Sequence, residues 1–143
     1  MSFVKIMVHS VWGVKNRERL LVSDRKAEML NHIRENAKKK DIFIDRINGH
    51  QDHLHALINL GAVQNISTVM QLIKGESSKW ANECSLFEKK FGWADKFYAA
   101  SVSESQLNFV RAYIDNQERH HEKVTFQQEC NEFMKRFGFE DLG

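Results

Sequence analysis

Hydrophobic and polar residues alternate near the start of the chain. Across residues 3–13, Val4, Ile6 and Val8 fall on one side of the alternation, with Lys5 and His9 among the residues on the other. Successive side chains of a strand point to opposite faces of a sheet. The alternation therefore predicts a first strand with one face toward a core.

Three later segments show strand-like patterns: residues 41–47 ("DIFIDRI"), 53–60 ("HLHALINL") and 96–103 ("KFYAASVS"). The first two are separated by "NGHQD". We expect a hairpin turn there, with Asn48 and Gly49 at its centre, because Asn-Gly is favoured in tight turns.

Apolar residues at spacings of three, four or seven predict four helices. They are expected from Asp24 to Lys39, from about Ile66, after Ser103 and after Thr125. Ser23 is a candidate N-cap for the first helix. Ser103 with Gln106, and Thr125 with Gln128, fit the capping-box pattern at the starts of the last two.

The predicted order of elements is β-α-β-β-α-β followed by two helices. This order defines the ferredoxin-like split βαβ motif, an α+β fold with an antiparallel sheet. Residues 1–143 contain no proline, repeat or Gly/Ser-rich linker, so we expect a single domain. With two helices on one face of the sheet, we expect the other face to be available for function.

The net charge of +2 is too small to indicate nucleic-acid binding by itself, but the charge is unevenly distributed. Residues 1–40 hold ten Lys or Arg and four Asp or Glu, whereas the remainder holds eleven and fifteen. This imbalance is consistent with a basic surface. A solvated helix face is the alternative, and the charge asymmetry alone favours it.

Cysteine usage and hydropathy indicate a cytoplasmic protein without a membrane span. Cys84 and Cys130 form no C-x-x-C pair, and we expect both to be buried, reduced thiols. The longest uncharged run, residues 54–73, contains too many polar residues to span a membrane. The first 14 residues carry a histidine and lack a small-residue cleavage site, so they do not resemble a signal peptide.

His53 and His55 stand two apart on the third predicted strand, so they share a face about 7 Å apart. Leu54 between them would point into the core, and both imidazoles would point outward. Neutral imidazole is a common metal ligand, but two ligands do not complete a site. From this pattern alone, a structural pair remains the alternative to a metal site.

Tyr113 and Gln117 are four residues apart and would lie one above the other on a helix. Tyr113 falls on the border of the apolar stripe of that helix. It could simply cover the edge of the sheet. Alternatively, its phenolate could attack a phosphodiester polarised by a metal, with Gln117 as an oxygen ligand one turn along.

Several motifs together resemble a known family, the single-tyrosine transposases of very small bacterial insertion sequences, within the HUH endonuclease superfamily. They also resemble the REP-associated relatives of these transposases. The His-hydrophobic-His motif matches His53-Leu54-His55, and the tyrosine-glutamine pair matches Tyr113 and Gln117. The segments "LIKGESSKW", "FGWADKFYAASVS" and "YIDNQERHH" extend the resemblance over nearly the whole chain.

The resemblance implies a metal-dependent enzyme that cuts and rejoins single-stranded DNA at hairpin ends. Tyr113 would become a 5′-phosphotyrosine and release a 3′-hydroxyl, which can later reverse the reaction. His53, His55 and Gln117 would hold Mg²⁺ or Mn²⁺. The resemblance also implies a homodimer in which the tyrosine helix of one subunit serves the histidine pair of the other.

Basic side chains are the candidates for DNA contact. The resemblance points to Lys74 and Lys79, which flank "GESS", and Arg17 and Arg19 lie in the basic early segment. Lysine and arginine suit a phosphate backbone, although a solvated helix face remains an alternative for the two lysines.

The other histidines are expected to have structural roles. His9 is expected to face outward from the first strand, and His50 to lie in a turn. His120 and His121 would end the tyrosine helix, where cations interact favourably with the helix dipole.

The tryptophans are expected to be structural as well. Trp80 lies in a predicted core stripe, and Trp12 and Trp93 are expected to be buried, although either could stack on unpaired bases.

Two other functions compete with strand transfer. The same fold could bind hairpin DNA or RNA as a catalytically silent regulator. An unrelated metal hydrolase could use the two histidines to activate water, but this would leave Tyr113 and Gln117 without a role.

Overall fold

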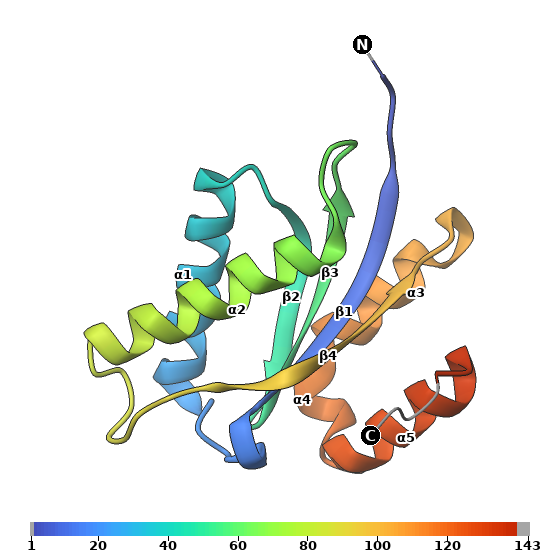
Figure 1. Ribbon diagram of the computed structural model, residues 1–143. Helices are drawn as coiled ribbons and strands as arrows, with labels where there is room; N and C mark the ends of the chain where they lie inside the picture. The colour runs from blue at the N-terminus through green and yellow to red at the C-terminus, as the bar shows by residue number, and fades with distance from the viewer. Residues whose placement is uncertain (1, 140–143) are drawn as a thin grey trace.

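The computed structural model describes residues 2–139. Its four strands form one antiparallel sheet in the order β2-β3-β1-β4 (Figure 1). The strands are β1 (Ile6–Val14), β2 (Phe43–His50), β3 (His53–Leu60) and β4 (Trp93–Ser101). The predicted ferredoxin-like order of elements is therefore confirmed.

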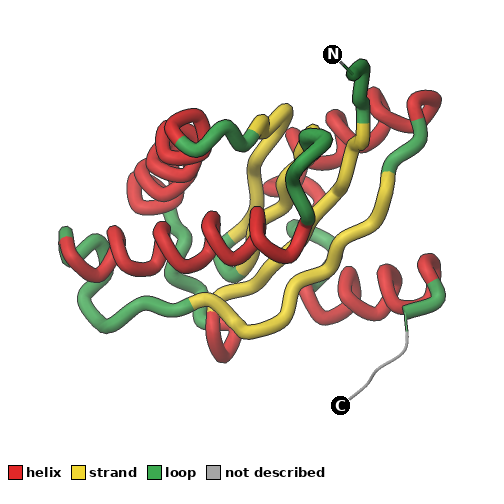
Figure 2. The backbone as a smooth tube through the Cα atoms, turned by 45° about the horizontal axis from the view of Figure 1, so that its top comes forward, coloured by secondary structure: helices red, strands yellow, loops and turns green. Residues whose placement is uncertain are grey.

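Helices cover both faces of this sheet (Figures 1 and 2). One layer contains α1 (Ser23–Lys39) and α2 (Ile66–Glu83), and the other contains α3 (Leu107–Asp115), α4 (Gln117–His120) and α5 (Phe126–Phe137). The expectation of an open second face was wrong, because the C-terminal helices fold back over it. Short 3₁₀ turns, η1 (Lys15–Arg17) and η2 (Glu104–Gln106), follow β1 and precede α3. Within residues 2–139, no helix has the length and apolar character needed to cross a membrane.

The main core lies between the sheet and the layer of α1 and α2. Leu54, Ala56 and Ile58 of β3 point into it and are fully buried, as their alternation predicted. The opposite face of the sheet holds two small apolar clusters. One is built from Met7, Leu57, Leu107 and Ile114, and the other from Val11, Phe126, Cys130 and Phe133.

The hairpin turn does not lie at Asn48 and Gly49. Both belong to β2, where they pair with His55 and Leu54, and the chain turns at residues 51–52. A Cβ at Gly49 would come within 2.1 Å of the carbonyl oxygen of His53, so the close approach of two strands, not a turn, requires this glycine. The Asn48 amide donates to the carbonyl oxygen of Ile114 at 3.0 Å and so ties the end of α3 to the sheet.

Two of the three predicted caps are absent. Ser23 lies inside α1, and neither it nor Ser103 provides a side-chain cap, so the chain enters both helices through backbone geometry alone. The third prediction is confirmed, because Thr125 and Gln128 form a complete capping box at the start of α5.

The expected environments of the cysteines and tryptophans are confirmed in part. Cys130 is buried, but Cys84 is exposed, because it lies at the C-terminal end of α2, just past the packed face. Trp12 and Trp93 are buried. Trp80 lies only partly in the core and stacks on His32 at the surface of the layer.

An ion pair joins α3 to the edge strand β2. The Nε and one terminal nitrogen of Arg111 each donate to an oxygen of Asp45 at 2.9 Å. These hydrogen bonds outweigh partial burial and lower the pKa of Asp45 below its ordinary value of 3.8. A two-point contact of this kind fixes the orientation of α3 over the sheet.

We predict that Asp45→Asn lowers the melting temperature at pH 7, because Arg111 loses its charged partner. Since the folded state depresses the pKa of Asp45, the contribution is present above the ordinary pKa of 3.8 and is lost as the pH falls through the folded value. The difference between the two melting temperatures should therefore shrink only as the pH falls below 3.8. Asp115→Asn serves as a control, because Asp115 is exposed and its ion pair with Arg46 spans 3.5 Å. Equal melting temperatures for wild type and Asp45→Asn at pH 7 would refute the prediction.

Candidate metal centre

Strand β3 places His53 and His55 on the same face of the sheet, as predicted. They do not face solvent: both side chains are fully buried beneath the C-terminal helices. Their partners on β1 are Gly13 and Val11. A Cβ at Gly13 would lie 2.8 Å from the ring of Phe126, so the missing side chain lets α5 pack close to the histidines.

Neighbouring polar groups hold the two imidazoles in orientation. Nδ1 of His53 lies 2.8 Å from a carboxylate oxygen of Asp52, and Nδ1 of His55 lies 2.8 Å from Nε2 of His9. His9 therefore does not face outward as expected, but is buried beside the pair. Both Nε2 atoms are left to point toward a common centre, an arrangement that is typical of metal-binding histidines.

The carboxylate of Glu129 occupies that centre. Its Oε1 atom lies 2.9 Å from Nε2 of His55, 3.1 Å from Nε2 of His53 and 3.3 Å from Nε2 of His121. One donor atom from each of these four residues lies within 4.8 Å of the others. Glu129 is 2 % exposed, and its position follows from the capped start of α5 four residues earlier at Thr125.

The side chain of Gln117, which the family resemblance offers as an oxygen ligand, also lies at this centre. Its side chain is fully buried, and its Oε1 lies 3.0 Å from Nε2 of His121 and 3.3 Å from Nε2 of His53. The helix is interrupted at Asn116, between α3 and α4. Gln117 nevertheless stays one turn below Tyr113, because its amide donates to the Tyr113 carbonyl oxygen at 3.3 Å.

Tyr113 lies at the edge of the centre and is half-buried, as its border position predicted. Its hydroxyl donates to Oε2 of Glu129 and lies 3.3 Å from Nε2 of His120. Burial and the adjacent Glu129 carboxylate raise the pKa of Tyr113, because both disfavour the phenolate. One carboxylate thus contacts the histidine cluster through one oxygen and the tyrosine through the other.

Electrostatics favour a cation at this centre. Burial lowers the pKa of His55 to about 4. Burial and the neighbouring His55 together lower the pKa of His9 to about 3, so both imidazoles are neutral at pH 7. Burial opposes ionisation of Glu129, but hydrogen bonds from His121, His53 and His55 hold its pKa well below the usual range. For His53, burial is outweighed by hydrogen bonds to Asp52 and Glu129, which raise its pKa.

The donor set fits a divalent transition metal. Imidazole nitrogens suit metal ions of borderline hardness, and a carboxylate oxygen suits harder ions. A set of three histidines and one glutamate therefore matches divalent ions of intermediate hardness. A buried carboxylate surrounded by imidazoles also needs a positive charge close by to offset its burial.

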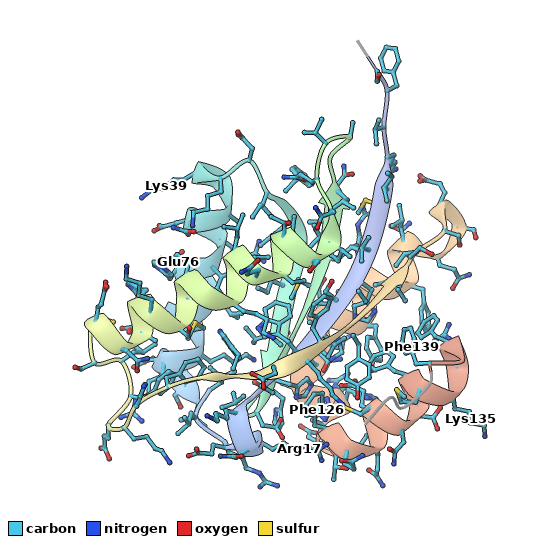
Figure 3. All side chains as sticks on the ribbon, viewed as in Figure 1. Arg17, Lys39, Glu76, Phe126, Lys135 and Phe139 are labelled. Carbon is cyan, nitrogen blue, oxygen red and sulfur yellow. The ribbon has the colours of Figure 1, made fainter. Side chains whose placement is uncertain are left out.

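The four basic residues predicted to contact DNA lie in two different places. Arg17 and Arg19 line a hollow of about 390 Å³ together with His50 and His121, directly beside the centre. The Arg17 guanidinium lies 5.8 Å from the centroid of the Phe126 ring (Figure 3). Lys74 and Lys79 lie instead on α2, in the opposite layer.

The sequence reasoning missed His121 and Glu129. His121 was assigned a role at the helix dipole, but the turn after α4 brings its imidazole to the cluster. Glu129 could have been found, because it is an acidic residue on the apolar stripe that includes Phe126, Cys130 and Phe133. A charged residue on a buried stripe indicates a polar partner in the interior.

The sequence matches the family described as "Transposase IS200 like" over residues 2–117, and the chain belongs to this family. No curated protein matches it. The match covers all four strands, both predicted histidine ligands, Tyr113 and Gln117, and it ends before α5.

Two solved structures share the fold. One is a candidate transposase from Deinococcus radiodurans, with a TM-score of 0.66 at 20 % identity, covering 81 % of this chain and 93 % of that one. The other is a REP-associated tyrosine transposase bound to a REP hairpin, with a TM-score of 0.64 at 19 % identity, covering 87 % of this chain and 73 % of that one.

We predict that Glu129→Gln weakens Mn²⁺ binding by on the order of tenfold or more, because it removes the one negative charge among the candidate ligands. Isothermal titration calorimetry of the folded proteins measures this directly. His53→Ala should abolish binding in the same assay. Glu132→Gln, an exposed glutamate on the same helix, is the matched control and should bind like wild type. Wild-type affinity in Glu129→Gln would remove Glu129 from the ligand set.

Proposed function

We propose that this protein is a metal-dependent DNA strand transferase that nicks and rejoins single-stranded DNA through Tyr113. The observation that carries the proposal is the Glu129 carboxylate, which accepts a hydrogen bond from the Tyr113 hydroxyl and contacts both histidines of the His53-Leu54-His55 motif. A nucleophile placed beside a metal centre is what transfer of a phosphodiester requires.

In the proposed reaction, the Tyr113 oxygen attacks the scissile phosphorus and the 3′-oxygen of the preceding nucleotide leaves. This yields a 5′-phosphotyrosine and a free 3′-hydroxyl. Attack by a 3′-hydroxyl on the same phosphorus then rejoins DNA and restores the tyrosine. Each step exchanges one phosphoester for another, so no external energy source is needed.

His53, His55, His121 and Glu129 would hold the metal ion, with the Gln117 side-chain oxygen beside them. Such an ion supplies positive charge that stabilises the transition state of phosphoryl transfer. Mg²⁺ and Mn²⁺ are the ions expected from the family resemblance. The three imidazoles favour Mn²⁺ over Mg²⁺, which prefers oxygen ligands.

The proposed substrate is a single-stranded DNA hairpin, and the proposed location is the cytoplasm. The REP-associated relative was solved with a REP hairpin bound, which supports a hairpin ligand for this chain. Arg17 and Arg19 are the proposed phosphate contacts, because their hollow adjoins the metal centre. DNA bound at the metal centre could reach Lys74 and Lys79 only by passing around the molecule to the opposite layer.

Tyr113→Phe is predicted to abolish DNA cleavage and to leave hairpin binding nearly unchanged, because it removes only the nucleophilic oxygen. A labelled hairpin oligonucleotide is incubated with protein and Mn²⁺ and resolved on a denaturing gel. Tyr98→Phe replaces the chain's other tyrosine and should still form the covalent band.

The same gel separates the competing functions. A protein–DNA adduct that disappears in Tyr113→Phe supports strand transfer. Hairpin binding without any cleavage supports a silent regulator, and cleavage without an adduct supports a hydrolase that activates water.

The family resemblance implies a homodimer with shared sites, and two copies would bring two hairpin ends together. The geometry within one chain supports a different arrangement, in which Tyr113 and the histidine pair of a site come from the same subunit. A single chain brings Tyr113 to its own histidines, with ring centroids of Tyr113 and His55 5.6 Å apart. We propose that each copy provides a full set of site residues in this arrangement.

Mixing Tyr113→Phe and His53→Ala subunits tests this allocation. If each site comes from one chain, every site keeps one defect and the mixture stays inactive, provided that subunit exchange is demonstrated. Return of activity, at up to about half of the wild-type site number in each heterodimer as two-fold symmetry predicts for shared sites, would show that Tyr113 acts in the partner's site.

A further inference from the structure

A wide groove leads from the molecular surface to Tyr113. It has a volume of about 910 Å³ and lies between α3 and α5, with His9 of β1 and the end of β4 also lining it. This is at the upper end of the range for small-molecule sites, which is about 300–1,000 Å³. Helix α5 lies beyond residues 2–117, so the part of the chain that matches the family forms only one side of the groove.

Aromatic side chains form both walls of the groove. Phe109 on α3 is 59 % exposed, and Phe137 on α5 is 40 % exposed. Large apolar side chains this exposed gain little stability for the folded chain. Planar rings on two sides of a groove are suited to stacking with flat, apolar ligand faces.

Polar groups of the same groove suit nucleotides. Lys123 and Arg136 contribute positive charge, against the carboxylates of Glu129 and Glu132, and the amides of Gln128 and Asn131 can donate to or accept from base edges. The combination of aromatic rings, cations and amides is typical of sites for unpaired nucleic-acid bases.

We propose that this groove binds the nucleotide that follows the scissile phosphate, with its base stacked on Phe109 or Phe137. The inference rests on the proposed function. After cleavage, this nucleotide is joined to Tyr113 through its 5′-phosphate, so it must lie within one phosphodiester of the tyrosine oxygen. The groove that Tyr113 lines holds it there until a 3′-hydroxyl arrives.

The first step of the test is to select a substrate from a pool of oligonucleotides. Wild-type protein, Mn²⁺ and a pool of random single-stranded oligonucleotides are incubated, and DNA attached to Tyr113 is sequenced to identify the first attached nucleotide. One captured oligonucleotide is then made with and without an abasic residue at that position. Rates of adduct formation are compared in wild type, Phe109→Ala, Phe137→Ala and Phe43→Ala.

Phe43 is the matched control, because it is 60 % exposed and does not line the groove. Loss of one stacked base should slow the wild type and Phe43→Ala roughly tenfold, since stacking of a base on an aromatic ring contributes about 1–3 kcal/mol. In the variant that lacks the stacking ring, the abasic penalty should fall below about twofold. An equal penalty in all four proteins overturns the proposal.

A separate measurement tests nucleotide binding in the groove independently of DNA cleavage. If wild-type protein captures no DNA from the pool, the groove is tested by fluorescence anisotropy with a labelled thymidine octamer, which needs no cleavage. At least one of Phe109→Ala and Phe137→Ala should then weaken binding roughly tenfold relative to Phe43→Ala. Unchanged binding in both variants rejects a nucleotide site and leaves the aromatic walls to a protein partner.

Discussion

The buried carboxylate of Glu129 is the interaction on which the site depends. An ionised carboxylate that is 2 % exposed is strongly unfavourable unless it is paired and hydrogen-bonded. Here the imidazoles of His53, His55 and His121 surround one oxygen, and the Tyr113 hydroxyl binds the other. The same contact therefore compensates the buried charge, gathers the candidate metal ligands and places the tyrosine beside them.

This constraint also explains how the second helical layer is attached to the sheet. The apolar clusters on that face are small, and polar contacts add to them: Asp45 binds Arg111 of α3, and Asn48 binds the carbonyl oxygen of Ile114. Glu129 does the same for α5. Because polar contacts fix the layer, its helices hold their positions relative to β3 with the geometric specificity that a site requires.

The site combines residues that lie inside the segment matching the family with residues that lie after it. The histidine pair, Tyr113 and Gln117 lie in the residues that match the IS200-like transposase family, whereas Glu129 lies in α5, after the match ends. Helix α5 supplies both a candidate ligand and one wall of the groove next to Tyr113. The donor set of the centre and the shape of its approach therefore both depend on α5 as well as on the segment that matches the family.

The sequence by itself determined the order of elements and the face that each residue of β3 takes, and it singled out the histidine pair, Tyr113 and Gln117 as candidates. The order of elements and the shared face of the histidines follow from local regularities, because alternation along a strand and the spacing along a helix are set by backbone geometry. Tyr113 and Gln117 were singled out by the family resemblance, because helix spacing alone left a structural role open. Only the tertiary structure decided that His53 and His55 are buried, that Asn48 and Gly49 lie in a strand, and that Glu129 and His121 join the site. The positions of α4 and α5 over the sheet depend on contacts between residues more than 60 positions apart, such as His55 and Glu129, which no local pattern encodes.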